Sequence, residues 1–409
     1  MDAKRKIIND PVFGFINIPN EFIYRIINHP YLQRLSRIKQ LGLASFVYPG
    51  AEHTRFHHSL GAMHLMSEAI NQLRLSGHKI SEEEKNAAMA AILMHDIGHG
   101  PFSHVLEEVL VDSMNHEEIS LLLMNRMNEE MSGQLTMAIA IFTDQYPKRF
   151  LHRLVSGQLD VDRLDYLRRD SFFTGVTEGN IGSARIIKML NLHDDKLVIE
   201  AKGIYSIENF LMARRLMYWQ VYLHKTTIAA EKMLINTLKR VKYLLFQGIP
   251  VDMPEVLRYF LSRTLNRSSF ENDRRTLDYY AKLDDHDVWC ALKTWTGHSD
   301  KVLSLLSDGL VNRSLFKIQF ESEPFGRELL EEKIEYYSRI YELDAEDASF
   351  LISSDVVSTN MYNEEDDSID ILYKNGEIKD IAVASDMLNI QLLSKNVRKY
   401  YFCFLRDSK

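Results

Sequence analysis

The chain has 409 residues, of which 45% are hydrophobic and 26% are charged. This length exceeds one ordinary domain, and the composition is typical of a folded globular protein, which excludes long disorder, collagen-like repeats and a disulfide scaffold. Lys and Arg number 49 against 57 Asp and Glu, which gives a net charge of −8. We therefore expect no general attraction to nucleic acid or to acidic membranes, and an anionic ligand needs a local basic site.

The two cysteines, Cys290 and Cys403, are too few for a disulfide framework, and neither has a second thiol at metal-ligand spacing. The first residues are basic but lack the apolar run of a secretory signal. No later segment approaches the roughly 18 consecutive apolar residues of a membrane span. We therefore expect a cytoplasmic protein with no membrane partner and no specific nucleic-acid partner.

Helical periodicity predicts that the first part of the chain is overwhelmingly α-helical. Residues 21–41 favour two short helices because Pro30 interrupts the pattern. Asn115, with Glu118 three residues later, resembles a capping box that starts another helix. The other predicted helices cover residues 58–76, 83–95, 134–147, 148–170, 183–191 and 205–245.

Strand-like segments become frequent only late in the chain. Before about residue 310, residues 194–200 are one of the few such runs. After it, four strand-like segments follow: SLFKIQFES, ASFLISSDVV, DSIDILYKNGEIKDI and KYYFCFLRD. Asn375 and Gly376 are typical of a two-residue hairpin turn. The expected fold class is therefore mainly α, with a helical domain over residues 1–308 and a small α+β domain over residues 309–409.

Histidine is concentrated in one part of the chain, because nine of the fifteen lie within residues 53–116. Imidazole is the commonest ligand for divalent transition metals and the usual acid–base group near neutral pH. Such crowding in a helical segment indicates a metal site, although any one of these histidines taken alone is more often a hydrogen-bonded core or surface residue. The nine are His53, His57, His58, His64, His78, His95, His99, His104 and His116.

The adjacent residues His95 and Asp96 end an otherwise apolar helix with one nitrogen ligand and one oxygen ligand. An unpaired carboxylate is costly there, so either a metal ion or a nearby cation must neutralise it. A tight metal site needs further ligands. The candidates are His58, which opens the preceding helix, and one of Asp160, Asp162 and Asp165.

Five blocks of sequence carry a family resemblance. They are KIINDPVFG (6–14), QLGLASFVYPGAEHTRFHHSLG (40–61), HDIGHGPFSH (95–104), NHEE (115–118) and DVDRLDYLRRD (160–170). The order His58, His95, Asp96, Asp162 resembles the signature of the HD-domain phosphohydrolase superfamily. The longer blocks resemble its deoxynucleoside triphosphate triphosphohydrolases, among them the sterile-alpha-motif and HD-domain enzyme, and several long motifs in order are far more specific than an isolated His-Asp pair. The resemblance implies an HD-domain helical bundle.

The resemblance implies a divalent metal ion held by His58, His95, Asp96 and Asp162. This mixed set of nitrogen and oxygen ligands suits Mn, Fe, Ni, Co or Zn, and Mg less readily. The activity implied is hydrolysis of deoxynucleoside triphosphates to deoxynucleoside and tripolyphosphate. In it, metal-bound water attacks the α-phosphorus and His116 protonates the leaving group as general acid.

The resemblance also assigns catalytic and substrate-binding side chains. The catalytic set is His116, Glu117, which orients its ring, and His104, which approaches the scissile phosphate. Within the substrate-binding set, arginines supply the local positive charge that an acidic protein needs for an anionic substrate, and other members contact the sugar or crowd its 2′ side. That set is Gln40, Leu41, Arg55, His99, Arg163, Tyr166, Asp170 and Tyr222.

The resemblance leaves regulation and substrate open. Guanine-activated members use an acidic residue and an arginine at the positions held here by Asn28 and Ser36. Activation by guanine nucleotides in that form is therefore not expected. The resemblance does imply a homo-oligomer, either a dimer or a tetramer. An HD phosphohydrolase acting on another phosphate ester, such as a nucleoside monophosphate, has the same metal ligands. A non-catalytic nucleotide-binding regulator is a third reading, although the intact ligands and His116 argue against it.

Overall fold

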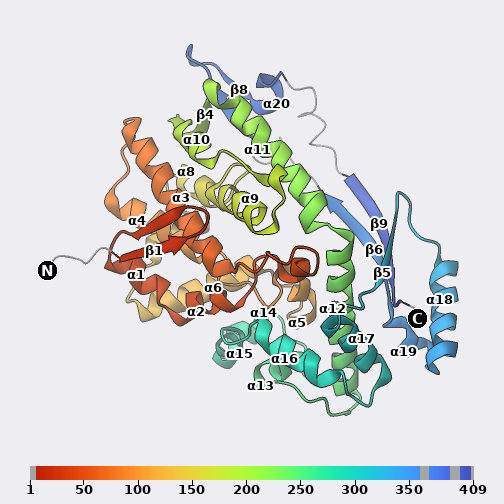
Figure 1. Cartoon of the computed structure of the whole chain (residues 1–409). Helices are drawn as coiled ribbons and strands as arrows, with labels where there is room; N and C mark the ends of the chain where they lie inside the picture. The colour runs from red at the N-terminus through yellow and green to blue at the C-terminus, as the bar shows by residue number, and fades with distance from the viewer. Residues whose placement is uncertain (1–5, 360–367, 387–396, 407–409) are drawn as a thin grey trace.

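Helices form most of the molecule, a computed structural model that describes residues 6–359, 368–386 and 397–406. Figure 1 shows the helical body, with β5, β6 and β9 grouped near α18 and with β4, β8 and α20 beside α11. This architecture confirms the expected fold class, mainly α with small sheets toward the C-terminus. None of the described helices has the length and apolarity needed to cross a membrane.

The helices of the first part are α1 (Glu21–Ile27), α2 (Pro30–Arg34), α3 (Arg55–Leu75), α4 (Glu82–Met94), α5 (Glu107–Leu110), α6 (His116–Glu130), α7 (Thr136–Phe142), α8 (Phe150–Val155), α9 (Val161–Thr174), α10 (Ser183–Lys188), α11 (Ile204–Met217) and α12 (Lys225–Phe246). Those that follow are α13 (Glu255–Leu261), α14 (Arg267–Asn272), α15 (Arg274–Tyr280), α16 (Asp285–Trp295), α17 (Lys301–Val311), α18 (Arg327–Tyr341), α19 (Ala345–Ser349) and α20 (Ile381–Ala384). Short 3₁₀ helices cover Leu35–Arg37, Gly42–Phe46, Ser103–Leu106, Thr177–Gly179 and Ala201–Gly203.

The strands of the described residues form three small sheets. The first is the antiparallel pair β1–β2, the second has the order β3-β4-β7-β8, and the third has the order β5-β9-β6. The strands are β1 (Lys6–Asp10), β2 (Gly14–Ile18), β3 (Leu190–His193), β4 (Lys196–Glu200), β5 (Lys317–Glu321), β6 (Ile352–Thr359), β7 (Asp370–Leu372), β8 (Ile378–Asp380) and β9 (Val397–Phe404).

One hydrophobic core continues through the described chain from Ile16 to Leu405. Helix α4 lies in its middle, since every residue from Ala87 to Met94 is buried, as expected for a helix that is apolar on nearly every face. Helix α3 packs against both α4 and α9. The packing of these three helices therefore fixes where their ends lie relative to one another.

Several local predictions are confirmed. Pro30 is the first residue of α2, where its missing N–H costs no helical hydrogen bond. Asn115 caps α6, because its side chain accepts a hydrogen bond from the Glu118 N–H at 2.9 Å and the Glu118 carboxylate accepts one from the Asn115 N–H at 3.1 Å. Gly376, at φ 86°, turns the β7–β8 hairpin.

The single helix predicted over residues 148–170 is wrong, because it is divided into α8 and α9. The Asp160 carboxylate accepts hydrogen bonds from the Gly157 N–H at 2.8 Å and from the Arg163 N–H at 2.7 Å. These local bonds compete with the helical ones and make Asp160 the N-cap of α9. The break leaves residues 156–160 as a loop between the two helices.

The helix predicted over residues 205–245 is also interrupted. A π-helical turn at Tyr218–Tyr222 follows α11, and α12 starts only at Lys225. His224 is extended, and its ring accepts a hydrogen bond from the Thr226 N–H at 3.2 Å. The irregular turn redirects the chain between α11 and α12.

The C-terminal strands do not all stand apart from the helical part. Strand β4 pairs in parallel with β7, with Ile199 opposite Ile371, so the hairpin β7–β8 extends a sheet that begins before α11. The expected domain boundary at residue 308 falls inside α17. The division of the chain into two domains stays a prediction.

Candidate metal-dependent active site

Three helix ends meet at the centre of the site. His58 lies in the first turn of α3, His95 follows the last residue of α4, and Asp162 lies in the first turn of α9. The His58 Nε2 atom is 3.0 Å from Asp162 Oδ1 and 3.3 Å from His95 Nε2, and His95 Nε2 is 3.6 Å from Asp162 Oδ1. These three side chains can therefore offer ligand atoms to one cation.

Asp96 completes the predicted set of four. Its carboxylate lies 3.3 Å from His95 Nε2 and 3.8 Å from His58 Nε2, and it is also paired with the Arg55 guanidinium. Burial alone lowers the pKa of His58, but hydrogen bonds to Asp162 and Asp165 raise it to about 10. The carboxylates thus attract positive charge to this point, which is the electrostatic environment that a divalent cation requires. The residues present fit a metal ion.

A second layer of hydrogen bonds orients the two histidines. The His58 Nδ1 atom lies 2.7 Å from Asp165 Oδ2, and His95 Nδ1 lies 2.6 Å from the Ile92 carbonyl oxygen. Since each Nδ1 faces an acceptor, it carries the proton, and Nε2 of each ring is left to bind metal. Of the three aspartates that the sequence left in competition, Asp162 therefore faces the ligands, Asp165 supports His58, and Asp160 caps the helix.

Asp165 is itself fixed by a buried ion-pair chain. The Arg169 guanidinium donates to both Asp165 oxygens at 2.9 Å and to Asp10 Oδ2 at 2.7 Å. Gly61 on α3 makes room for this chain, because a Cβ atom there would collide with Asp165 Oδ1 and Arg169 Nη2. The absence of a side chain at Gly61 therefore permits α3 and α9 to approach closely where the ligands meet.

His116, the predicted general acid, starts α6 beside this cluster. Its ring stacks on that of His99, with 3.8 Å between ring centroids, and His99 Nε2 lies 3.3 Å from Asp96 Oδ1. Burial and the nearby Arg55 hold the pKa of His99 well below its usual value, so this ring is neutral. The structure therefore places His99 and His116 beside the predicted metal ligands.

The other two catalytic candidates are Glu117 and His104. The Glu117 side chain is exposed. The backbone of His104 lies in the 3₁₀ helix Ser103–Leu106, but its side chain is outside the described part. The roles assigned to Glu117 and His104 stay predictions.

A cavity of about 570 Å³ opens next to the metal cluster. It is lined by Asp96, Asp162 and His116, by all eight predicted substrate-binding residues, and by the α12 residues Thr227, Glu231, Lys232 and Ile235. The eight are Gln40, Leu41, Arg55, His99, Arg163, Tyr166, Asp170 and Tyr222. Residues far apart in the sequence are thus gathered around one space, although their individual roles stay predictions.

Two polar groups of this cavity are suited to a sugar. Asp170 is buried between His53 Nε2, at 2.7 Å, and the Tyr222 hydroxyl, which donates to it at 2.9 Å. The Gln40 Oε1 atom is buried, and no described residue donates a hydrogen bond to it. A buried acceptor without a donor is costly, and a ligand hydroxyl can satisfy it.

The positive charge of the cavity comes from two arginines held in place by neighbours. The Arg55 Nε atom donates to Ser103 Oγ at 2.9 Å, and its Nη1 contacts Asp96. The Arg163 Nε atom donates to the Gly157 carbonyl oxygen at 2.7 Å. Both guanidiniums are fixed before any substrate binds, which suits recognition of an anion.

Sequence reasoning missed the wall of the cavity formed by α12. Thr227, Glu231 and Ile235 are spaced by four residues and face the cavity from successive turns. Burial raises the pKa of Glu231 to about 7. A single glutamate in an amphipathic helix carries no sequence signal of such a position.

Comparison with known proteins supports this geometry. The HD domain family matches residues 55–169, from the start of α3 into α9, which include all four clustered ligands. The HD associated region matches residues 181–245, which cover α10 to α12. The matched segments therefore contain most of the residues that line the main cavity.

Individual relatives are similar over much of the chain. The uncharacterized protein YwfO of Bacillus subtilis is 32% identical over 93% of this chain and 88% of its own length. Human SAMHD1, named a deoxynucleoside triphosphate triphosphohydrolase, is 27% identical over 79% of this chain and 56% of its own length. The crystal structure of a phosphohydrolase from Bacteroides thetaiotaomicron is 62% identical, with a TM-score of 0.96 over 98% of this chain and 100% of that one. The chain, with the four clustered ligands in the matched domain, belongs to the HD-domain phosphohydrolase family.

Proposed function

We propose that this protein hydrolyses deoxynucleoside triphosphates to deoxynucleoside and tripolyphosphate. The observation that carries the proposal is the single cavity of about 570 Å³ in which the metal cluster, two arginines and the sugar-binding candidates meet. Its volume lies in the range of ligand pockets that enclose a small molecule. The similarity to human SAMHD1 over 79% of this chain supports the same substrate class.

The proposed reaction gives a role to the predicted metal ligands and to two arginines. The ion held by His58, His95, Asp96 and Asp162 would activate water and neutralise phosphate charge. Arg55 and Arg163 bind phosphate oxygens, and the positive N-terminal ends of α3 and α9 add to the attraction.

His116 supplies the proton in this scheme. The activated water attacks the α-phosphorus, and the bond between this phosphorus and the 5′ oxygen breaks. The electron pair left on the 5′ oxygen takes the proton from His116. The neutral His99 ring stacks on the His116 ring, with 3.8 Å between their centroids, and so holds the His116 imidazole in its orientation. The products are the deoxynucleoside with its 5′ hydroxyl and tripolyphosphate.

Preference for deoxyribose rests on crowding near Tyr222. The Tyr222 hydroxyl is committed to Asp170 at 2.9 Å, so it is held as a fixed wall rather than a free hydrogen-bonding group. Tyr218 supports the same ring, with 5.1 Å between ring centroids. A pocket that merely excludes a hydroxyl discriminates by about 10²-fold, less than one that hydrogen-bonds it.

The donor set also limits the metal in this proposal. Two imidazoles and two carboxylates favour Mn, Fe, Ni, Co or Zn over Mg, because Mg prefers oxygen ligands alone. Loading the protein with each ion in turn and measuring affinity tests this order.

The experiment that tests the function is a substrate panel with Mn²⁺-loaded protein. Deoxynucleoside triphosphates, ribonucleoside triphosphates and nucleoside monophosphates are compared, and tripolyphosphate, pyrophosphate and orthophosphate are separated. We expect tripolyphosphate from the deoxynucleoside triphosphates. Orthophosphate from monophosphates alone would instead establish a phosphatase for another ester, and metal binding without any turnover would favour a non-catalytic regulator.

A further inference from the structure

A buried carboxylate outside the lining of the catalytic cavity joins two segments that lead into that cavity. Asp285 is the first residue of α16 and is only 3% exposed. Its Oδ2 atom accepts a hydrogen bond from the Lys39 N–H at 2.9 Å, and its Oδ1 atom accepts one from the Phe102 N–H at 2.9 Å. One side chain thus connects α16 to two segments that are distant from it and from each other in the sequence.

These bonds differ from those of an ordinary acidic residue at the start of a helix. Asp284 already caps α16, because its side chain accepts a hydrogen bond from the His286 N–H at 3.0 Å. Burial raises the pKa of Asp285 to about 6, because the charged form loses its hydration. A buried carboxylate that depends on two distant backbone N–H groups is costly, and groups of this kind are typical of functional sites.

The bond to Lys39 fixes a short backbone ladder that carries two substrate-binding candidates. The Arg55 N–H donates to the carbonyl oxygen of the residue before Lys39 at 2.9 Å. The Gln40 N–H donates to the His53 carbonyl oxygen at 3.0 Å. The backbones of Gln40 and Arg55 therefore belong to one ladder, and the Lys39 N–H between these two bonds is tied to Asp285.

The bond to Phe102 holds a strained turn. Phe102 and Ser103 have φ values of 54° and 58°, a left-handed region that residues with a side chain rarely adopt, so the surrounding contacts must hold the turn in place. Ser103 Oγ accepts a hydrogen bond from Arg55 Nε at 2.9 Å. Asp285 therefore acts on Arg55 twice, through the ladder at its backbone and through the turn at its guanidinium.

A buried arginine fixes the corner from which Asp285 acts. Arg34 is 1% exposed, and its Nε atom donates to the Leu283 carbonyl oxygen at 2.8 Å, just before α16. The same guanidinium donates through Nη1 to the Ile97 carbonyl oxygen at 3.0 Å and through Nη2 to that of His99 at 2.7 Å. The start of α16 and the loop that carries the stacked His99 ring are thus held together by one side chain.

We propose that Asp285 is a positioning residue for substrate binding, which holds Gln40 and the Arg55 guanidinium at the separation that a sugar and its phosphates require. Asp285 lies outside both matched family regions. The identity of the substrate, a deoxynucleoside triphosphate, rests on the proposed function. Since Gln40 and Arg55 contact the substrate before and during reaction, their displacement weakens binding rather than the chemical step.

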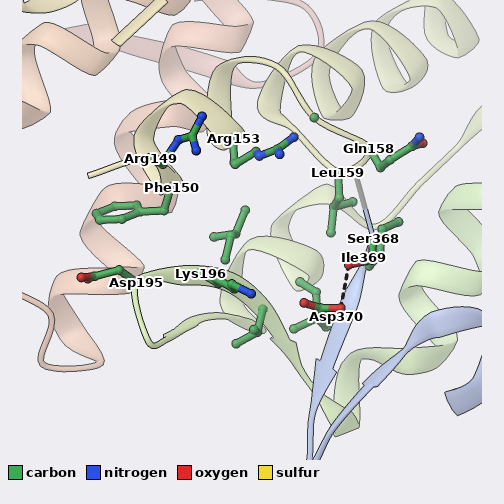
Figure 2. Close-up of a pocket in the computed structure, with 14 residues that line it drawn as sticks. Arg149, Phe150, Arg153, Gln158, Leu159, Asp195, Lys196, Ser368, Ile369 and Asp370 are labelled. Carbon is green, nitrogen blue, oxygen red and sulfur yellow. Dashed lines mark hydrogen bonds between the residues drawn. The ribbon is translucent and has the colours of Figure 1, made fainter. Parts of the chain in front are cut away.

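The principal variant is Asp285→Asn, which keeps the shape of the side chain but offers one oxygen atom to two N–H groups. A second variant, Ser103→Ala, removes the hydroxyl that meets Arg55 Nε. The control is Asp370→Asn, the same chemical change at a remote carboxylate. Figure 2 shows Asp370 at a separate cavity of about 350 Å³, whose described lining residues differ from those of the catalytic cavity.

The measurements are steady-state kinetics at saturating Mn²⁺ and calorimetric binding of tripolyphosphate, which needs no turnover. We expect Asp285→Asn to raise KM at least about 10-fold with kcat little changed, because a misplacement of about 1 Å in a site can cost about 100-fold. Its affinity for tripolyphosphate should fall by a similar factor, and Asp370→Asn should behave as wild type. Partial unfolding has the opposite signature, since a smaller active fraction lowers kcat and leaves KM unchanged.

Ser103→Ala should raise KM by a smaller factor than Asp285→Asn does. The double variant should raise it by less than the product of the two single effects, because both changes release the same guanidinium. Independent effects in the double variant, or a lower kcat with wild-type KM in Asp285→Asn, would overturn the positioning role.

Ser103→Ala also decides the matter if Asp285→Asn does not fold, since wild-type KM and wild-type tripolyphosphate affinity in Ser103→Ala would overturn the link to Arg55. If none of these proteins hydrolyses a deoxynucleoside triphosphate, the proposed function fails. The tripolyphosphate comparison then still decides whether Asp285 positions the anion-binding groups.

Discussion

The Nδ1 atom of His58 lies 2.7 Å from Oδ2 of Asp165, while Nε2 of the same ring lies 3.0 Å from Oδ1 of Asp162. Two carboxylates three residues apart on α9 thus act on opposite sides of one imidazole. Asp162 faces the other predicted metal ligands, and Asp165 holds the His58 ring in its orientation. Position along the helix, rather than residue type, decides which aspartate can bind metal.

Asp165→Asn is expected to weaken metal binding. The amide cannot replace the charge that binds Arg169 and favours the Nδ1–H form of His58, and loss of such a support typically lowers metal affinity about 10- to 100-fold. Metal titration of the purified variant measures this, and excess metal should restore part of the activity. Asp308→Asn, at an exposed position of α17, is the control. Wild-type metal affinity in Asp165→Asn would contradict this role.

His116→Ala should abolish turnover while metal remains bound. General acid catalysis contributes about 10²- to 10⁴-fold, and the predicted metal ligands do not include His116. Rates and metal content are measured on the same preparation, with the exposed His286→Ala as control. Activity that survives in His116→Ala would remove this histidine from proton transfer.

Gly61→Ala is expected to lower both stability and metal affinity. The added Cβ atom would collide with Asp165 and Arg169, so α3 and α9 must separate where the ligands meet. Overpacking of this kind costs about 1–3 kcal/mol of the free energy of unfolding. Gly297→Ala, where an added Cβ meets nothing within 4 Å, is the matched control for thermal denaturation. Equal melting temperatures for the two variants would show that the helices tolerate the side chain.

Glu231 should make stability depend on pH. Its pKa is raised from 4.5 to about 7 in the folded protein because burial disfavours the charged form. The folded state therefore holds the proton more tightly than the unfolded state does, and this contribution to stability is full below the unfolded pKa and is lost as pH rises through the folded pKa. Lys232, also on the cavity wall, reduces the shift without cancelling it.

Glu231→Gln removes this ionisation. The melting temperature of the variant should gain on that of wild type as pH rises from about 4.5 to about 8, because only wild type must bury the charge. Denaturation of both proteins across this range measures the difference. Parallel curves would show that Glu231 is ionised without cost in the folded protein.

The parts of the fold that depend on local sequence could be predicted. Pro30 starts α2 and Asn115 caps α6 because each effect needs only neighbours in the chain. The break between α8 and α9 was missed, because Asp160 turns back to the Gly157 N–H only in the folded loop. The parallel pairing of β4 with β7 joins distant segments, and no local pattern encodes it.

The candidate site, like the fold, has parts that could be predicted from the sequence and parts that could not. The clustered ligands could be predicted because long motifs carry them, and the structure brings them together. The residues alone left Asp160, Asp162 and Asp165 in competition, and the family resemblance selected Asp162, the one that faces His58 Nε2 in the structure. Glu231 was not found at all, since only the packing of α12 against the cavity makes it part of the site.

The most direct test of the central claim is hydrolysis of a deoxynucleoside triphosphate in ¹⁸O-labelled water, with mass analysis of every product. Attack at the α-phosphorus predicts that the label appears in tripolyphosphate and that the deoxynucleoside keeps its unlabelled 5′ oxygen. Label in orthophosphate or pyrophosphate, with a nucleotide as the other product, would contradict the proposed reaction.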